Sequence, residues 1–177
     1  MRNPPIIQIL ILLVFATSFI QCGHDNEQKK KPDPASYEEF LIKANQETVR
    51  VENEQINDYI RRHKLEMETT ATGMRYMILK EGIGPKVEPM RRVKLAYTLT
   101  LLSGDTVYTA LEDGPLVFEV GKGQVITGLE EAILLLRVGD RAKIIIPSHL
   151  AFGLIGDQKK IFHKASLVYD IELISMY

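Results

Sequence analysis

The hydrophobic pattern of the chain changes after Thr69, and this change constrains the fold more than any other feature of the sequence. Beyond it, β-branched and aromatic residues gather in short runs separated by turn signals such as Gly82-Ile83-Gly84-Pro85 and Ser103-Gly104-Asp105. Such runs are typical of the strands of an antiparallel sheet. The expected strands are Met74–Leu79, Val93–Leu102, Leu116–Val120, Arg141–Ile146 and Ser166–Ile174.

One run breaks the strand pattern. The segment from Leu129 to Leu136 is rich in helix-forming residues, and Ile133 is its only β-branched member. These residues favour a short helix. A single short helix packed on an antiparallel sheet gives an α+β fold.

A longer helix is expected ahead of the sheet. Ser36 and Glu39 match a capping box, and the sequence from Tyr37 to Lys64 contains neither Gly nor Pro. Its apolar stripe is interrupted and is clearest at Ile56, Tyr59 and Ile60. We therefore expect a helical arm over residues 37–69. The arm is either half exposed, or it buries its stripe against a second copy and forms a homodimer.

The N-terminus indicates export. The run from Ile6 to Ile20 carries no charge, and the only cysteine, Cys22, follows it. Fifteen helical residues span roughly 22 Å, less than the ~30 Å hydrocarbon core of a membrane. The layout resembles a bacterial lipoprotein signal, which implies a signal peptide at 1–21 and lipidation of Cys22. An uncleaved membrane anchor and an incidental cysteine are the alternatives.

Composition limits the partners of the chain. The 22 Lys and Arg residues nearly balance 23 Asp and Glu residues, so there is no basic footprint for nucleic acid. Residues 22–36 include Lys29-Lys30-Lys31 and two prolines but no large apolar residue, which predicts a flexible tether. The four histidines are scattered and suggest no metal site, and no cofactor is expected.

Several fragments from residue 70 onward stand in a recognisable order, namely Val93–Thr98, Gly104-Asp105, Phe118–Ala132, Val138–Lys143, Ile146-Pro147, Leu150–Gly153 and Leu167–Leu173. Their order and spacing resemble those of the FKBP-type peptidyl-prolyl isomerases. The resemblance covers residues 70–177 and implies five or six antiparallel strands wrapped around the short helix. The N-terminal helix, the lipoprotein-like start and Gly156–Ile161 are similar to the gliding-motility-associated and periplasmic lipoprotein branch.

The resemblance also implies a reaction, rotation about the Xaa-Pro amide bond of a proline-containing polypeptide. The barrier of ~18–20 kcal/mol comes from amide resonance, which is lost when the bond twists. A dry site favours the twisted state over the planar one. This chemistry needs no nucleophile, metal or cofactor.

The resemblance assigns site residues by position. The catalytic set is Tyr97, the backbone N–H of Ile126, and Phe152. The residues expected to bind the substrate are Val107, Tyr108, Leu116, Val125, Leu129, Ile161 and Tyr169.

Five of these positions depart from the family pattern. Leu129 replaces a tryptophan, Leu116 replaces a phenylalanine, and Phe152 replaces a tyrosine. Val107-Tyr108 stands where the family has an aromatic residue followed by aspartate, so the family's aspartate is missing.

These features leave three hypotheses for function. The first is a prolyl isomerase of reduced activity, held by lipid to the bacterial cell envelope, facing the periplasm or on the outer membrane, where it assists the folding of exported proteins. Tyr97, Val125 and Ile126 favour it. The second is a non-catalytic FKBP-like lipoprotein that binds peptides or a partner, which Leu129, Tyr108 and Phe152 favour. The third is an accessory part of a surface or gliding machinery and is compatible with either of the others.

Overall fold

The computed structural model describes residues 34–177. The predicted signal peptide (1–21), Cys22 and the tether up to residue 33 lie outside the described residues. The elements are α2 (Pro34–His63), β1 (Glu68–Thr69), β2 (Arg75–Lys80), β3 (Arg92–Leu101), β4 (Thr106–Thr109), α3 (Ala110–Asp113), β5 (Leu116–Glu119), α4 (Thr127–Leu134), β6 (Arg141–Ile146), the 3₁₀ helix η1 (Ser148–Leu150) and β7 (Leu167–Met176).

The chain divides into two compact units, 1–42 and 43–177. The first contributes only the opening turns of α2 to the described residues, where Tyr37 and Phe40 are exposed. Helix α2 begins at Pro34 and not at Tyr37 as expected, which fits the preference of proline for the first turn of a helix. Within residues 34–177, no helix combines the length and apolarity that crossing a membrane requires.

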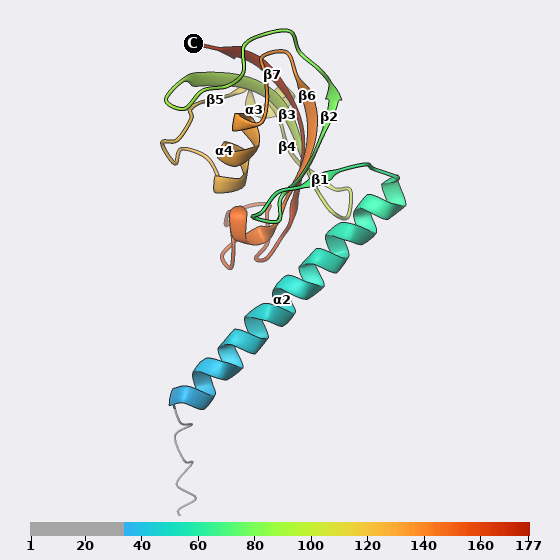
Figure 1. Ribbon diagram of the computed structural model, residues 1–177, viewed down its shortest axis with the longest axis vertical. Helices are drawn as coiled ribbons and strands as arrows, with labels where there is room; N and C mark the ends of the chain where they lie inside the picture. Colours follow the sequence, from blue (N-terminus) through green and yellow to red (C-terminus); the bar gives the residue numbers. More distant parts are fainter. Residues whose placement is uncertain (1–33) are drawn as a thin grey trace, which may run out of the picture. The chain divides into compact units, whose positions relative to one another are not determined.

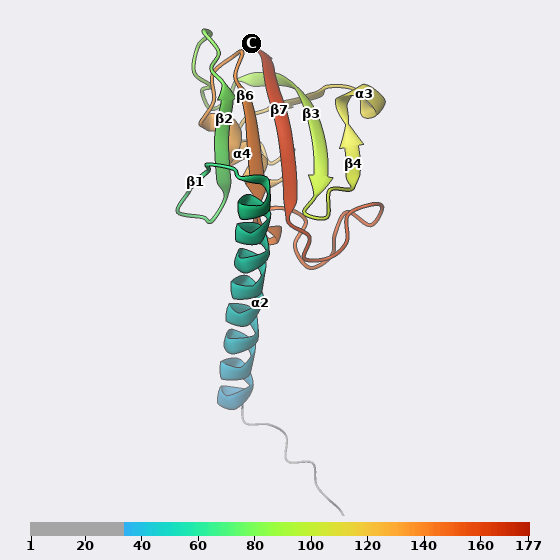
Figure 2. The ribbon, with the colours of Figure 1, turned by 90° about the vertical axis from the view of Figure 1, so that its right-hand side faces the viewer.

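The second unit is built on one antiparallel sheet of seven strands, which confirms the expected α+β fold. The order is β1-β2-β6-β7-β3-β4, with β5 paired to β3 as well. Strands β4 and β5 share one edge of β3, since β5 pairs with residues 92–95 and β4 with residues 98–100. Helix α4 lies against one face of this sheet (Figures 1 and 2).

The sheet has more strands than the sequence suggested. The additional strands β1 and β4 have only two and four residues. Segments this short carry too few alternating positions for a hydrophobic period to be recognised. Their pairing with β2 and β3 is what makes them strands.

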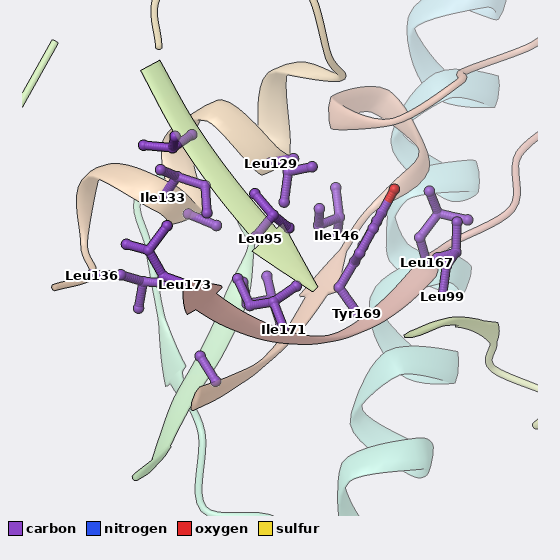
Figure 3. Packing of buried hydrophobic residues seen from close by; sticks show 14 of the residues in the cluster. Leu95, Leu99, Leu129, Ile133, Leu136, Ile146, Leu167, Tyr169, Ile171 and Leu173 are labelled. Carbon is purple, nitrogen blue, oxygen red and sulfur yellow. The ribbon is translucent and has the colours of Figure 1, made fainter. Parts of the chain in front are cut away.

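The core lies between α4 and the sheet. Leu129 and Ile133 of α4 are buried among sheet residues that include Leu95, Ile146 and Leu173 (Figure 3). Residues of β6 alternate between the two faces of the sheet, as the two-residue period of a strand requires. Ile144 and Ile146 join this core, while Ile145 between them faces the opposite side.

The opposite face of the sheet is covered in part by α2. Ile56 and Tyr59 are buried against Ile145 of β6 and Val168 of β7, and Ile60 packs beside them. Ile145 and Val168 are register partners, so they form a continuous apolar row on this face. The apolar stripe of the arm, which the sequence left either half exposed or packed against a second copy, is therefore buried largely within the chain.

Candidate functional site

The turn before α4 presents Ile126. The Gln124 side chain accepts a hydrogen bond from the N–H of Glu119 at 2.9 Å, and the Glu130 carboxylate accepts one from the N–H of Gly123 at 2.8 Å. Ile126 is the N-cap of α4, and its carbonyl accepts hydrogen bonds from the N–H groups of Leu129 and Glu130. Hydrogen bonds therefore fix the backbone both before and after Ile126.

The N–H of Ile126 itself donates to no group among residues 34–177. The side chain of Ile126 is half-buried and packs against the main core. An unpaired donor at the edge of an apolar cluster is available to a carbonyl oxygen of a bound peptide. A carbonyl that reached it would have apolar surroundings and one fixed hydrogen bond.

Two tyrosines lie on neighbouring strands. The rings of Tyr97 on β3 and Tyr169 on β7 have their centroids 6.1 Å apart at an interplanar angle of 42°. Burial raises the pKa of both phenols, with smaller contributions from Asp113 at Tyr97 and from Tyr97 at Tyr169. Both hydroxyls are therefore protonated near neutral pH, and within residues 34–177 neither makes a hydrogen bond to another group of the protein. They are available as donors.

The segment between η1 and β7 carries Phe152, Asp157 and Ile161. Asp157 Oδ1 accepts hydrogen bonds from the backbone N–H groups of Lys159, Lys160 and Ile161 at 2.9, 3.0 and 2.7 Å. Its other oxygen, Oδ2, accepts a hydrogen bond from the hydroxyl of Tyr108. One carboxylate thus shapes the turn and attaches it to β4.

The hydrogen bond between Tyr108 and Asp157 shifts the pKa values of both groups. The hydrogen bond to Asp157 is the main reason that the pKa of Tyr108 rises to about 12. Burial acts to raise the pKa of Asp157, but the hydrogen bonds from Tyr108 and the three amides outweigh it and lower that pKa. Lys160 Nζ lies 4.9 Å from the Tyr108 ring centroid and donates to the carbonyl of Val107 at 3.0 Å.

The structure brings the ten predicted site residues of the domain into one hydrophobic cluster. Four are buried, namely Val107, Leu129, Ile161 and Tyr169. Six are partly buried and pack against the same core cluster, namely Tyr97, Tyr108, Leu116, Val125, Ile126 and Phe152. Leu129 is only 1% exposed, so this predicted site residue is also a core residue.

Sequence reasoning missed the carboxylates around this cluster. The family's aspartate is absent from position 108, but Asp113 at the end of α3 lies close enough for its charge to raise the pKa of Tyr97 and Tyr108. The family resemblance includes Asp157 only as part of the segment Gly156–Ile161. Its position at the start of the turn Asp157–Lys160 is a signal for a side chain that caps backbone amides.

A family model described as FKBP-type peptidyl-prolyl cis-trans isomerase matches residues 84–174. This match spans just over half of the chain. The chain belongs to this family.

Relatives of the FKBP-type domain include the bovine peptidyl-prolyl cis-trans isomerase FKBP11, which is 37% identical over 114 residues, covering 63% of this chain and 56% of the relative. The FKBP-type isomerase FkpA of Aeromonas hydrophila is 35% identical over 111 residues, covering 62% of this chain and 40% of the relative. The matches thus span roughly half the length of these relatives.

A solved structure has the same fold as the FKBP-type domain. The crystal structure of AtFKBP13 superposes with a TM-score of 0.61 at 27% sequence identity. The match covers 63% of this chain and 99% of that structure. Among residues 34–177 the FKBP-type domain has no group of three or more His, Cys, Asp or Glu side chains placed to hold a metal ion.

Proposed function

We propose that this FKBP-type domain catalyses cis-trans isomerisation of Xaa-Pro bonds in proline-containing polypeptides. The observation that carries the proposal is the unpaired N–H of Ile126 at the edge of the apolar cluster. A substrate carbonyl that accepts from this N–H is held while the neighbouring apolar side chains exclude water. The planar amide is more dipolar than the twisted one, so a dry site lowers the barrier to rotation.

NMR exchange spectroscopy on Xaa-Pro peptides with the full-length chain in detergent tests this function. Ile126→Pro removes the donor, and the native φ of −59° at this residue is one that proline adopts. The matched control is Ile126→Ala, which shortens the side chain but keeps the N–H. Ile126→Pro should lower kcat/KM a further 2- to 10-fold below Ile126→Ala, about the value of one neutral hydrogen bond. Equal activity of the two variants would contradict the proposal.

We propose that the activity is lower than that of a domain with the full family set of site residues. Phe152 lacks a hydroxyl, which is worth about 0.5–1.5 kcal/mol as one hydrogen bond. Leu129 offers less apolar area than tryptophan, plausibly another ~1 kcal/mol. Together these losses correspond to roughly 10- to 100-fold in kcat/KM.

The alternative is a non-catalytic domain that binds peptides or a partner protein, including a part of a surface or gliding machinery. The observation that favours it is the hydrogen bond of Tyr108 to Asp157, which leaves one fewer free hydroxyl for a substrate. A folded native domain that binds proline peptides but gives no exchange above the uncatalysed rate would support this alternative.

We further propose that the chain is exported, assists the folding of exported proteins, and is attached by lipid on Cys22 to the bacterial cell envelope, facing the periplasm or on the outer membrane. The support is the short uncharged run ahead of the sole cysteine. Several acyl chains hold a protein firmly to a membrane, whereas one holds it marginally. Cys22→Ser followed by cell fractionation tests the attachment, and unchanged retention with an uncut N-terminus would indicate an uncleaved anchor.

A homodimer through α2 is the remaining proposal about partners. Because Ile56 and Tyr59 are buried within the chain, it rests on exposed apolar residues earlier in the helix, among them Tyr37, Phe40 and Leu41. Sedimentation of the full-length chain in detergent tests it. A monomer at every concentration would contradict it.

A further inference from the structure

Both ends of the segment that carries Phe152 and Ile161 meet at one carboxylate of α2. Glu52 Oε1 accepts hydrogen bonds from the N–H of Ser148 at 2.6 Å and from the hydroxyl of Ser166 at 2.6 Å. Glu52 Oε2 accepts a third, from the hydroxyl of Ser148 at 3.0 Å. Ser148 opens η1, and Ser166 immediately precedes β7. Segment 148–166 is therefore closed at its base by Glu52.

The contacts continue from Ser148 to Phe152. The carbonyl of Ser148 accepts hydrogen bonds from the N–H groups of Ala151 and Gly153 at 3.0 and 2.9 Å, one on each side of Phe152. Gly153 in turn accepts from the N–H of Lys164 at 2.7 Å, which joins the two halves of the segment. A shift of Ser148 would therefore be transmitted to Phe152.

Contacts other than those of Glu52 also attach α2 to the sheet. Ile56 and Tyr59 make that attachment through apolar contact, and Arg75 of β2 donates to Asn53 at 3.1 Å. Glu52 is only 8% exposed, and burying a carboxylate is costly unless its oxygens accept hydrogen bonds. Among residues 34–177, every hydrogen bond that its side chain accepts comes from Ser148 or Ser166.

We propose that Glu52 is a positioning residue of the isomerase site: its carboxylate clamps the two ends of segment 148–166 and so holds Phe152 and Ile161 in place to bind the peptide. The proposal rests on the proposed function for its catalytic consequence. Glu52 does not touch the substrate. Its removal should weaken peptide binding, while the rotation step, which depends on the apolar surroundings and the N–H of Ile126, should change little.

The test compares Glu52→Gln with Glu54→Gln in the full-length chain in detergent. Glu54 lies on the same helix but is exposed and pairs with Arg50, so it is a matched control. Hydrogen exchange followed by mass spectrometry should show the amides of segment 148–166 exchanging roughly tenfold faster or more in Glu52→Gln, with β3 and β6 unchanged. KM and the Kd for a proline peptide should rise about 3- to 10-fold with kcat within twofold, and Glu54→Gln should match the native protein.

A second variant keeps the test decisive if Glu52→Gln does not fold. Ser166→Ala releases only one end of the segment and should produce the same changes at smaller size. Unchanged exchange in segment 148–166 would overturn the proposal, as would faster exchange with unchanged peptide Kd. The hydrogen-exchange rates and the peptide Kd are measured without turnover. A native protein that binds peptide but does not isomerise it would therefore refute the proposed function. The positioning role of Glu52 would still be decided by the exchange rates and the peptide Kd.

Discussion

The hydroxyl of Tyr108 on β4 donates a hydrogen bond to Asp157, 49 residues further along the chain. The same carboxylate accepts from the backbone amides of Lys159, Lys160 and Ile161. Asp157 therefore organises the turn that delivers Ile161 to the core and joins that turn to the edge of the sheet. Glu52 bonds both ends of segment 148–166, so this segment has two polar attachments, one at its base and one near its middle.

Asp157→Ala should lower the free energy of unfolding by about 1–3 kcal/mol, because it removes hydrogen bonds to a charged group and leaves three amides without their acceptor. The lowered pKa of Asp157 means that this stability is present above the unfolded pKa of about 4 and is lost as the pH falls through the folded value. Urea unfolding of the native protein and the variant at pH 7 and at pH 3 measures both effects. A difference that is as large at pH 3 as at pH 7 would contradict the role of the carboxylate charge.

Asp157→Asn should lower the pKa of Tyr108 from about 12 toward the ordinary tyrosine value of about 10. The neutral phenol is favoured in the folded state, so its contribution to stability is present below pH 10 and is lost as the pH rises through 12. A titration of the tyrosine Cζ resonances by NMR reports each ring. Tyr169 is the internal control, because burial is the main cause of its raised pKa, and its titration should not move.

Ile56→Ala should destabilise the domain by about 2–5 kcal/mol, because Ile56 is fully buried against the outer face of the sheet and its loss leaves a cavity. Val49→Ala on the same helix is the control. Val49 is 46% exposed, so its truncation should stay within about 0.5 kcal/mol. Denaturant midpoints that shift equally in the two variants would show that α2 is not part of the folded domain.

Leu129→Trp should restore the residue type of the family yet lower the free energy of unfolding by about 1–3 kcal/mol. Leu129 is 1% exposed and lies beside the fully buried Leu95, so a larger ring must displace core side chains. Leu129→Met conserves volume and should cost less than about 1.5 kcal/mol. A tryptophan variant as stable as the native protein would contradict the expectation that the core around Leu129 is tightly packed.

Phe152→Tyr should raise kcat/KM by about 2- to 10-fold, the value of one added hydrogen bond to the substrate. Phe152 is half-buried in the cluster, so a new hydroxyl can reach a bound peptide without entering the core. The matched control is Phe162→Tyr, which adds the same group to a side chain that is 73% exposed. An equal gain in both variants would indicate a general effect of the hydroxyl and not a contact in the site.

The sequence predicted most of the fold, because most of its strands and helices show a local hydrophobic periodicity. The runs expected at Val93–Leu102 and Arg141–Ile146 became β3 and β6 with shifts of at most one residue. The ten residues that the family resemblance, and not periodicity, assigned to the site also lie in one cluster. Periodicity could not assign β4, whose four residues form a strand only through pairing with β3.

What the sequence by itself determined is therefore the α+β architecture, the arm helix and most of the apolar core. What only the tertiary structure decided is which face of the arm is buried and which polar groups hold segment 148–166. Glu52 follows the spacing of Ile56 and Tyr59 along α2, but its partners Ser148 and Ser166 lie 96 and 114 residues away. Hydrogen bonds over such separations depend on how the sheet brings distant segments together, and no local pattern of residues encodes them.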